Sequence, residues 1–188
     1  MNLVKALVVG IASLGASYAY AADATNSIAS LRYFSETTKQ MQAHFEQSTY
    51  DASGYLTDES TGVFFFNRPN QFRWVYETPI EELILGDGEF LWHYDPTLAQ
   101  VMRQPQPNSA YSPLLVLSDY EMLMGLYDVT VGPSPSQIVL LPREFDAPIE
   151  QARVTLEGGQ PVVVEWEDRF GQINRLIFSQ IELNQPLN

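Results

Sequence analysis

Carboxylates and histidines are the side chains of this sequence that could do acid–base or metal chemistry. Glu165, Glu167 and Asp168 lie beside an expected turn, where paired carboxyl groups can act as general acid and general base. With 23 acidic residues, however, some carboxylates are neighbours by chance, and we interpret these three as a solvated strand face. The two histidines, His44 and His93, have no ligand at helical or turn spacing, so we interpret them as unrelated polar side chains.

Motifs for other kinds of catalysis are absent. The sequence has no Gly-x-Ser-x-Gly elbow, phosphate-binding loop, dinucleotide glycine fingerprint or His-Glu-x-x-His motif, and it contains no cysteine. We therefore predict no catalytic residue, no metal site and no cofactor. A hydrolase that uses paired carboxylates stays open as the enzymatic alternative.

The composition indicates one acidic globular domain. Hydrophobic residues make up 45% of the 188 residues and charged residues 18%, which excludes the composition of a disordered chain. Ten Phe, ten Tyr and three Trp supply ample material for a large apolar interior. The net charge of −13 argues against a nucleic-acid partner, because such proteins present a basic surface.

The first residues have the pattern of a secretory signal. Lys5 precedes an apolar run over residues 6–15, and Ala19-Tyr20-Ala21 is a small-x-small cleavage pattern. The run is too short to span a bilayer, which takes about 20 residues. We predict a signal peptide over 1–21, a single domain over 22–188, and localisation in the periplasm without disulfides.

The spacing then predicts one helix followed by a mainly antiparallel sheet. Apolar and small residues at helical spacing, after Asn26 or Ser27 as an N-cap, are Ile28, Leu31, Ser35, Thr38 and Met41 or Gln42. Beyond Tyr50 the period changes to two, and turn residues separate short strands. Asp87-Gly88 predicts a type I′ hairpin turn between strands at 82–85 and 90–92.

Alternation places aromatic side chains on one face of several strands. The aromatic residues at alternate positions are Phe64 and Phe66, then Phe72, Trp74 and Tyr76, then Phe90, Trp92 and Tyr94. Arg68 falls on the side of Phe64 and Phe66. We expect neighbouring strands to combine these residues into one broad aromatic face that needs a cover.

The segment 111–126 is the predicted cover. Ser112-Pro113 is typical of a helix start, and Leu114, Leu115 and Leu117 follow it. Pro105 and Pro107 predict an irregular segment upstream, which would let the cover hinge as a lid. The alternative is that these leucines fill an ordinary core.

Together these motifs resemble one known family. The run 62–74 reads Gly-Val-Phe-Phe-Phe-Asn-Arg-Pro-Asn-Gln-Phe-Arg-Trp, and 91–96 reads Leu-Trp-His-Tyr-Asp-Pro after Asp87-Gly88. Phe45-Glu46-Gln47, Gln100-Val101 and Ser112-Pro113-Leu114-Leu115 stand in the matching order. The sequence resembles the outer-membrane lipoprotein carrier protein family, LolA, over most of residues 28–182.

The resemblance implies a fold and a function. The fold is mainly β with short helices: an incomplete antiparallel β-barrel, or half-barrel, whose N-terminal helix and lid helices cover a hydrophobic cavity. The protein would be a monomeric, non-enzymatic periplasmic carrier without cofactors, with acylated lipoproteins as cargo, an inner-membrane lipoprotein-releasing ABC transporter as donor and an outer-membrane lipoprotein receptor as acceptor. The predicted ligand-binding residues are Phe64, Phe66, Arg68, Phe72, Trp74, Trp92, Leu114, Leu115 and Leu117.

Two further expectations come from the resemblance. The family arginine at the position of Arg68 hydrogen-bonds the lid in the closed, empty form, which makes Arg68 a candidate lock. Family members continue past the strand that ends near Leu183 with a further C-terminal strand that is missing from this sequence. Either the sequence is truncated or this variant lacks the final strand, and residues 173–183 would then be left as an uncovered sheet edge. Another periplasmic lipid- or lipoprotein-binding module, acting as a sensor or regulator, stays open as the alternative function, although such proteins usually carry a second domain.

Overall fold

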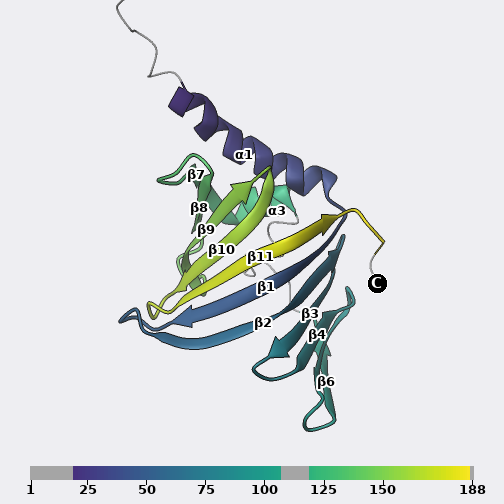
Figure 1. Ribbon diagram of the computed structural model, residues 1–188. Helices are drawn as coiled ribbons and strands as arrows, with labels where there is room; N and C mark the ends of the chain where they lie inside the picture. Colours follow the sequence, from purple (N-terminus) through teal and green to yellow (C-terminus); the bar gives the residue numbers. More distant parts are fainter. Residues whose placement is uncertain (1–18, 107–118, 187–188) are drawn as a thin grey trace, which may run out of the picture.

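One continuous antiparallel sheet forms the frame of the molecule (Figure 1). The computed structural model describes residues 19–106 and 119–186, with side chains from residue 27 onward. The elements are α1 (Ala19–Thr37), β1 (Gln40–Tyr50), β2 (Leu56–Asn67), β3 (Gln71–Thr78), β4 (Glu82–Gly86), β5 (Phe90–Asp95), β6 (Gln100–Pro105), α3 (Tyr120–Leu126), β7 (Tyr127–Val131), β8 (Gln137–Pro142), β9 (Ile149–Glu157), β10 (Gln160–Asp168) and β11 (Ile173–Leu183).

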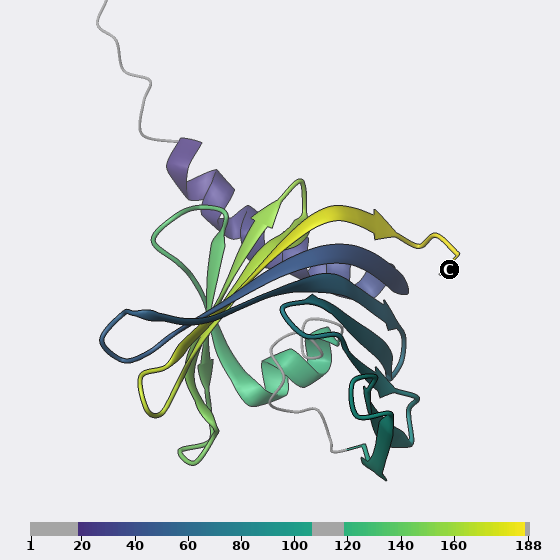
Figure 2. The same cartoon turned by 60° about the horizontal axis from the view of Figure 1, so that its bottom comes forward.

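The strands form a single curved layer that stays open. The 11 strands pair in the order β6-β5-β4-β3-β2-β1-β11-β10-β9-β8-β7. Because β6 and β7 are the two end strands, the sheet curls without closing into a barrel, and the predicted half-barrel is confirmed. In Figure 2 the helix α3 lies within the hollow of the curved sheet.

Alternation decides which face of the sheet is buried. In β9 the side chains of Ala152, Val154 and Leu156 are buried, while their neighbours in sequence are at least partly exposed. They join Leu31 of α1 and Leu123 of α3 in one core cluster. Fully burying an aliphatic side chain of this size contributes about 1.5–3 kcal/mol, so the helices hold the concave side of β7–β10 firmly.

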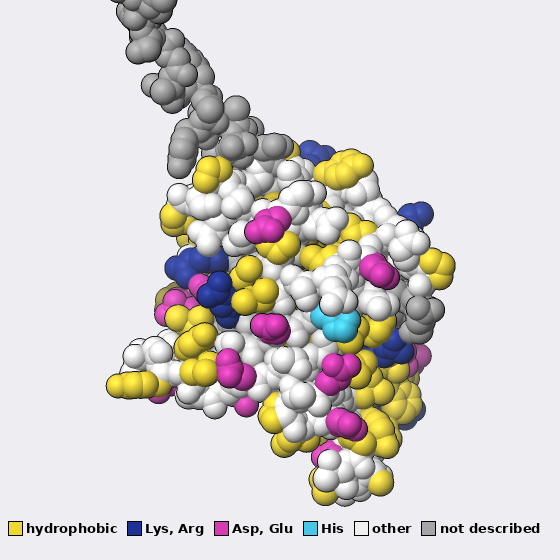
Figure 3. Space-filling view, viewed as in Figure 1, with side chains coloured by type: hydrophobic (Ala, Val, Ile, Leu, Met, Phe, Trp, Pro, Cys, Tyr) yellow, Lys and Arg dark blue, Asp and Glu magenta, His cyan; other side chains and the backbone are white. Residues whose placement is uncertain are grey.

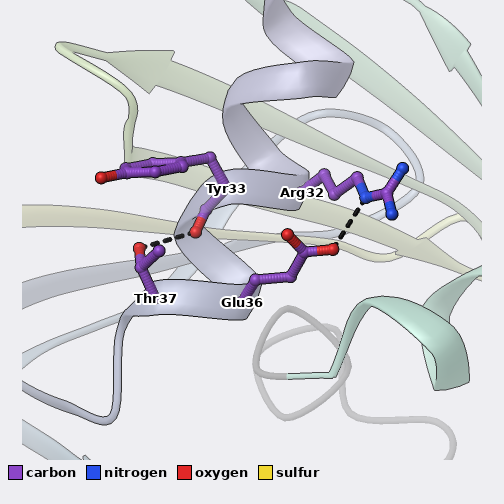
Figure 4. A network of polar contacts seen from close by, with 4 residues as sticks. All are labelled: Arg32, Tyr33, Glu36 and Thr37. Atoms are coloured by element: carbon purple, nitrogen blue, oxygen red, sulfur yellow. Dashed lines mark hydrogen bonds and ion pairs between the residues drawn. The ribbon is translucent and has the colours of Figure 1, made fainter.

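The last residues of α1 make polar contacts within the helix and with Asn184, which follows β11. Arg32 Nε lies 2.8 Å from Glu36 Oε1, and Thr37 Oγ1 donates to the Tyr33 carbonyl at 2.7 Å (Figure 4). Beyond β11, Asn184 Nδ2 donates to the Thr37 carbonyl at 3.3 Å. The exposed Arg32–Glu36 pair contributes only about 0.3–0.5 kcal/mol. The Asn184 contact is therefore the one that positions the helix end relative to the strands.

The predicted helix is right in its centre and wrong at both ends. The helix already runs from Ala19, so Asn26 and Ser27 lie inside it and do not cap it. Met41 and Gln42 belong to β1, where Met41 is buried in the alternating pattern of a strand. The predicted helix extended too far because Met41, the next apolar residue at helical spacing, is also the first buried residue of β1.

The predicted hairpin at Asp87-Gly88 exists, but its turn is not type I′. That turn needs positive φ at both central residues; Gly88 has φ +102°, whereas Asp87 is not among the described residues with positive φ. Four residues, 87–90, connect the paired Gly86 and Leu91. Asp87 Oδ1 instead accepts the N–H groups of Glu89 at 2.8 Å and Phe90 at 2.7 Å, and these bonds shape the turn.

The predicted uncovered edge at residues 173–183 is wrong. These residues form β11, which pairs with β1 on one side and β10 on the other, with Phe45 opposite Phe178 and Val164 opposite Leu176. The last strand therefore joins the two halves of the sheet. The backbone groups on one side of β1 bond to β2, and those on the other side pair with β11, which therefore becomes a central strand.

Only part of the predicted cover lies within the described residues. The helix α3 begins after Asp119, whose Oδ1 accepts the Met122 N–H at 3.0 Å as an N-cap. Its Leu123 is buried in the core. The expected helix start at Ser112-Pro113 lies outside the described residues. None of the described helices is long and apolar enough to cross a membrane.

Candidate functional site

A row of side chains crosses the concave face from β2 to β6. Directly paired residues of an antiparallel sheet point to the same side. Phe64 pairs with Trp74, Trp74 with Ile84, Ile84 with His93, and His93 with Met102. Phe64 is part of the core cluster that the helices cover, so the whole row lies on the concave face.

Trp74 is the centre of an aromatic cluster on this face. Its ring centroid lies 4.3 Å from that of Phe64, 4.9 Å from Phe45 and 6.2 Å from Tyr76. Phe45 meets Trp74 edge to face at 79°, a favoured geometry that contributes about 0.5–1.5 kcal/mol beyond the burial of area. Phe178 extends the cluster toward β11, 6.0 Å from Phe64. The result is a rigid apolar surface that spans four strands.

The predicted aromatic residues fall into two levels of burial. Phe64, Phe66 and Phe72 are 2%, 5% and 8% exposed and already belong to the core. The half-buried apolar residues that pack on this core are Trp74, Tyr76, Ile84 and Leu91. The core phenylalanines therefore support the face, and the half-buried residues offer the surface that a ligand could contact.

Phe72 owes its position to a glycine on the next strand. Gly86 pairs with Phe72, and a Cβ at Gly86 would lie 2.3 Å from Cε1 of the Phe72 ring. The missing side chain lets the ring lie flat against β4. Because Phe72 is so tightly enclosed, a charge there would be buried without a partner and would unfold the protein rather than probe a binding site.

Trp92 does not share the face of Trp74. It pairs with Leu85 and Arg103, which lie on the convex face, so the expected single aromatic face over β3 and β5 is wrong. Trp92 Nε1 donates to Asp87 Oδ2 at 2.7 Å. The N–H groups of Phe90, Trp92 and Glu89, in that order of effect, lower the pKa of the Asp87 carboxyl. Trp92 thus has a structural partner in the hairpin turn.

Arg68 lies at the end of β2 where the concave face meets an open groove of about 750 Å³. Its guanidinium carbon is 5.8 Å from the Phe66 ring centroid, and its backbone N–H donates to the Lys39 carbonyl at 2.9 Å. The buried Nε and Nη2 atoms have no hydrogen-bond partner among the described residues. Burial lowers the pKa of Arg68, and the carboxylate of Asp119 partly offsets this effect. Within the part of the chain that the structure describes, these two nitrogens are therefore donors without a matching acceptor.

Polar side chains lie beside the apolar surface on the side away from Arg68 along the strands. His93 Nε2 lies 2.6 Å from Glu82 Oε1, and both side chains are about one-third exposed. Tyr76 pairs with Glu82 and donates from its hydroxyl to Gln47 Oε1 at 3.3 Å. Burial, and then the nearby Glu82 and Asp58 carboxylates, raise the pKa of Tyr76 to about 12. The apolar surface thus runs between Arg68 and this polar cluster.

Leu114, Leu115 and Leu117 lie outside the described residues, so their place over the face stays a prediction. Sequence reasoning missed several residues that the register places on the concave face: Phe45, Ile84, Leu91, Met102 and Phe178. Each of these residues lies on a strand whose alternation is visible in the sequence. The pairing between strands, which decides which residues share a face, is not visible there.

The side chains considered for catalysis have structural roles. Glu165 Oε1 lies 2.9 Å from Arg153 Nη1, and the Asp168 carboxylate accepts backbone N–H groups in the turn before β11. His44 is exposed on the convex face, whereas His93 lies on the concave face, so the two cannot share a metal. No group of three or more metal-ligating side chains occurs among residues 19–106 and 119–186.

Comparison with known proteins gives a consistent result. The family model "Outer membrane lipoprotein carrier protein LolA" matches residues 36–188. An outer-membrane lipoprotein carrier protein of Nitrosospira multiformis is 35% identical over 166 residues, covering 85% of this chain and 80% of the relative. The carrier protein of Bordetella pertussis is 34% identical over 178 residues, covering 93% of this chain and 83% of the relative. That of Pseudomonas aeruginosa is 30% identical over 192 residues, covering 100% of this chain and 92% of the relative.

Solved structures share the fold at low identity. MucB, in the Pseudomonas aeruginosa MucA/MucB complex, aligns with a TM-score of 0.50 at 17% identity, over 88% of this chain and 59% of that chain. An uncharacterized conserved protein of Thermus thermophilus aligns with a TM-score of 0.50 at 12% identity, over 89% of each chain. At these identities the likeness shows the curved sheet and its helices alone.

Proposed function

The chain belongs to the outer membrane lipoprotein carrier protein LolA family, and from this membership we propose that it binds the acyl chains of lipoproteins on its concave face and shuttles them from the inner membrane to an outer-membrane acceptor. The observation that carries the proposal is the half-buried apolar surface of Trp74, Tyr76, Ile84 and Leu91. A carrier of acyl chains needs such a surface, whereas a catalyst does not.

The energetics of acyl chains favour this kind of surface. Each buried CH₂ contributes about 0.8 kcal/mol, so a protein with several acyl chains does not cross water unaided. A rigid pocket with many polar anchors would hold its ligand too specifically for transfer. Flat aromatic rings such as Trp74 and Phe64 offer many weak contacts instead, and these can be released one by one.

Arg68 is proposed to control release. Within the described residues its Nε and Nη2 atoms are unpartnered donors, and the carboxylate of Asp119, the N-cap of α3, acts electrostatically on its charge. A guanidinium offers five N–H donors, and the free carbonyls at the C-terminal end of a helix, such as the one predicted to start at Ser112-Pro113, need donors. We propose that Arg68 bonds the covering segment when the face is empty. Loading must then break those bonds, which favours delivery to the acceptor.

The compartment and partners follow from the same proposal. Residues 1–21 would direct export to the periplasm and be removed there. A lipoprotein-releasing ABC transporter of the inner membrane would load the carrier, and an outer-membrane lipoprotein receptor would unload it. Removal of residues 1–21 takes away Lys5, and the resulting net charge of −14 would keep the monomeric carrier away from anionic lipid surfaces between these encounters.

A matched pair of variants on β4 tests the proposal. Ile84 and Leu85 are neighbours, both half-buried, and they point to opposite faces of the sheet. We expect Ile84→Glu to weaken binding of a fluorescent fatty acid at least about tenfold, because a carboxylate would stand in the apolar row. Leu85→Glu, the control, is expected to bind within about twofold of the parent, because its face is not used.

Folding of both variants is checked first by circular dichroism and thermal unfolding. Equal loss in both folded variants would contradict binding on the concave face. Absence of fatty-acid binding by the parent protein would contradict the proposed function itself.

A further inference from the structure

Within the described residues, the end strand β6 has no strand on its outer side. Among the described strands it alone has every residue exposed, and Val101 and Met102 are each 61% exposed. The strand order ends at β6, so its outer side has no strand partner among the described residues. Figure 3 shows hydrophobic side chains gathered toward this part of the sheet. An open edge of this kind can pair with an added strand.

The pairing with β5 tells which backbone groups face outward. Gln106 N donates to the Glu89 carbonyl, and the register continues with Leu91 opposite Gln104 and His93 opposite Met102. In an antiparallel ladder, bonded and non-bonded pairs alternate. The N–H and C=O groups of Val101 and Arg103 therefore point away from β5, and Pro105 offers a carbonyl only.

This edge borders the proposed acyl-binding surface. Met102 is the last residue of the row that runs from Phe64 through Trp74 and Ile84. At the other side of that row the sheet continues through β1 and β11, and the helices pack against β7–β10. A polypeptide that leaves the apolar surface on the side of Met102 therefore meets β6, whose outer side has no strand partner among the described residues.

We propose that the polypeptide following the acylated residue of a bound lipoprotein adds to β6 as a further strand. The proposal rests on the proposed function, since the acyl chains must first lie on the concave face. Strand addition uses main-chain hydrogen bonds, which do not read side chains. One edge can thus accept cargoes of different sequence. Arg103 is the sole charged residue of β6, so neutral or acidic segments suit the edge.

Backbone methylation of the cargo gives a test with a specific signature. The probe is a synthetic triacyl lipopeptide with a neutral peptide, made in two forms that are N-methylated at alternate sets of positions. In an added strand, N–H groups point alternately toward and away from β6. We expect one form to bind about 5- to 20-fold more weakly than the unmethylated lipopeptide, and the other to bind within about twofold. Equal binding of both forms would overturn the proposal.

A proline variant tests the edge from the side of the carrier. Val101→Pro removes an outward N–H and leaves the bonds to β5 intact, because edge strands accept proline at such positions. We expect it to bind the lipopeptide about 5- to 20-fold more weakly, while Val101→Thr, which keeps the N–H, binds like the parent. A fluorescent fatty acid should bind all three proteins equally.

The fatty acid separates the two proposals. If the parent binds the fatty acid but Val101→Pro has no effect on the lipopeptide, strand addition is wrong and the carrier function stands. If the parent binds neither probe, the carrier function fails and strand addition fails with it. If Val101→Pro loses the fatty acid as well, its fold is damaged, and the methylation result in the parent protein decides.

Discussion

Titration of Tyr76 is expected to make the free energy of unfolding depend on pH in the alkaline range. Burial raises its pKa to about 12 in the folded protein, whereas an exposed tyrosine has a pKa of about 10. Between these values the unfolded chain releases the phenol proton and the folded chain keeps it. The free energy of unfolding therefore has its full value below pH 10 and falls as the pH rises toward 12.

The size of the effect follows from the two pKa values. At pH 11 most unfolded chains have lost the Tyr76 proton and most folded chains have kept it. This difference lowers the free energy of unfolding by about 1.4 kcal/mol relative to pH 9. In Tyr76→Phe this contribution is absent. That variant loses only a 3.3 Å hydrogen bond to Gln47, at a cost of about 0.5–1 kcal/mol at every pH.

Urea unfolding of the parent and Tyr76→Phe at pH 9, 10 and 11 gives the comparison. The other titrating groups are common to both proteins, so their effects cancel in the difference. We expect the parent to be the more stable protein at pH 9 and to lose that advantage by pH 11. A difference that stays constant from pH 9 to 11 would refute the assignment of Tyr76 as a buried phenol on this face.

Three other outcomes are expected. Gly62→Ala should lower the free energy of unfolding by about 2–4 kcal/mol, because its Cβ would lie 1.9 Å from the Val75 carbonyl oxygen. Gly125→Ala in α3 has open space around the new Cβ and should raise the free energy of unfolding by about 1 kcal/mol. Urea unfolding measures both changes. Arg68→Leu should still bind lipoprotein but deliver it poorly when the acceptor is added, and unchanged delivery by the folded variant would disprove the lock. The intact mass of exported protein should match cleavage after Ala21, and a mass that includes residues 1–21 would disprove the signal peptide.

The strands were predictable because each one carries its own signal. In β3, Phe72, Trp74 and Tyr76 alternate with polar residues or with the convex-facing Val75, and the observed strand contains all three predicted aromatic residues. The boundary between α1 and β1 was less predictable. Met41 fits both periods, and only burial against the sheet decides for the strand.

The shared face was not predictable from alternation alone. In β2, β3 and β4 the even-numbered residues point to the concave side, as Trp74 and Ile84 show. Across the Asp87 turn, Ile84 pairs with His93, so in β5 the odd-numbered residues do so. Trp92 thus faces the convex side although its strand has the same aromatic alternation. Only the register at each turn settles this, and register depends on tertiary pairing.

The position of β11 shows the same limit on a larger scale. A strand was predicted at residues 173–183, and β11 covers these residues. Its neighbours β1 and β10 are an outcome of topology, since β1 is distant in sequence. No local pattern distinguishes a central strand from an edge strand.

The central claim is that this protein holds a lipoprotein by its acyl chains. The most direct measurement incubates the purified protein with a triacylated lipoprotein and, separately, with the same lipoprotein produced without acylation. Size-exclusion chromatography followed by intact mass spectrometry then identifies any complex. We expect a one-to-one complex with the acylated form, which Ile84→Glu weakens and Leu85→Glu does not. Co-elution of both forms, or of neither, would contradict it.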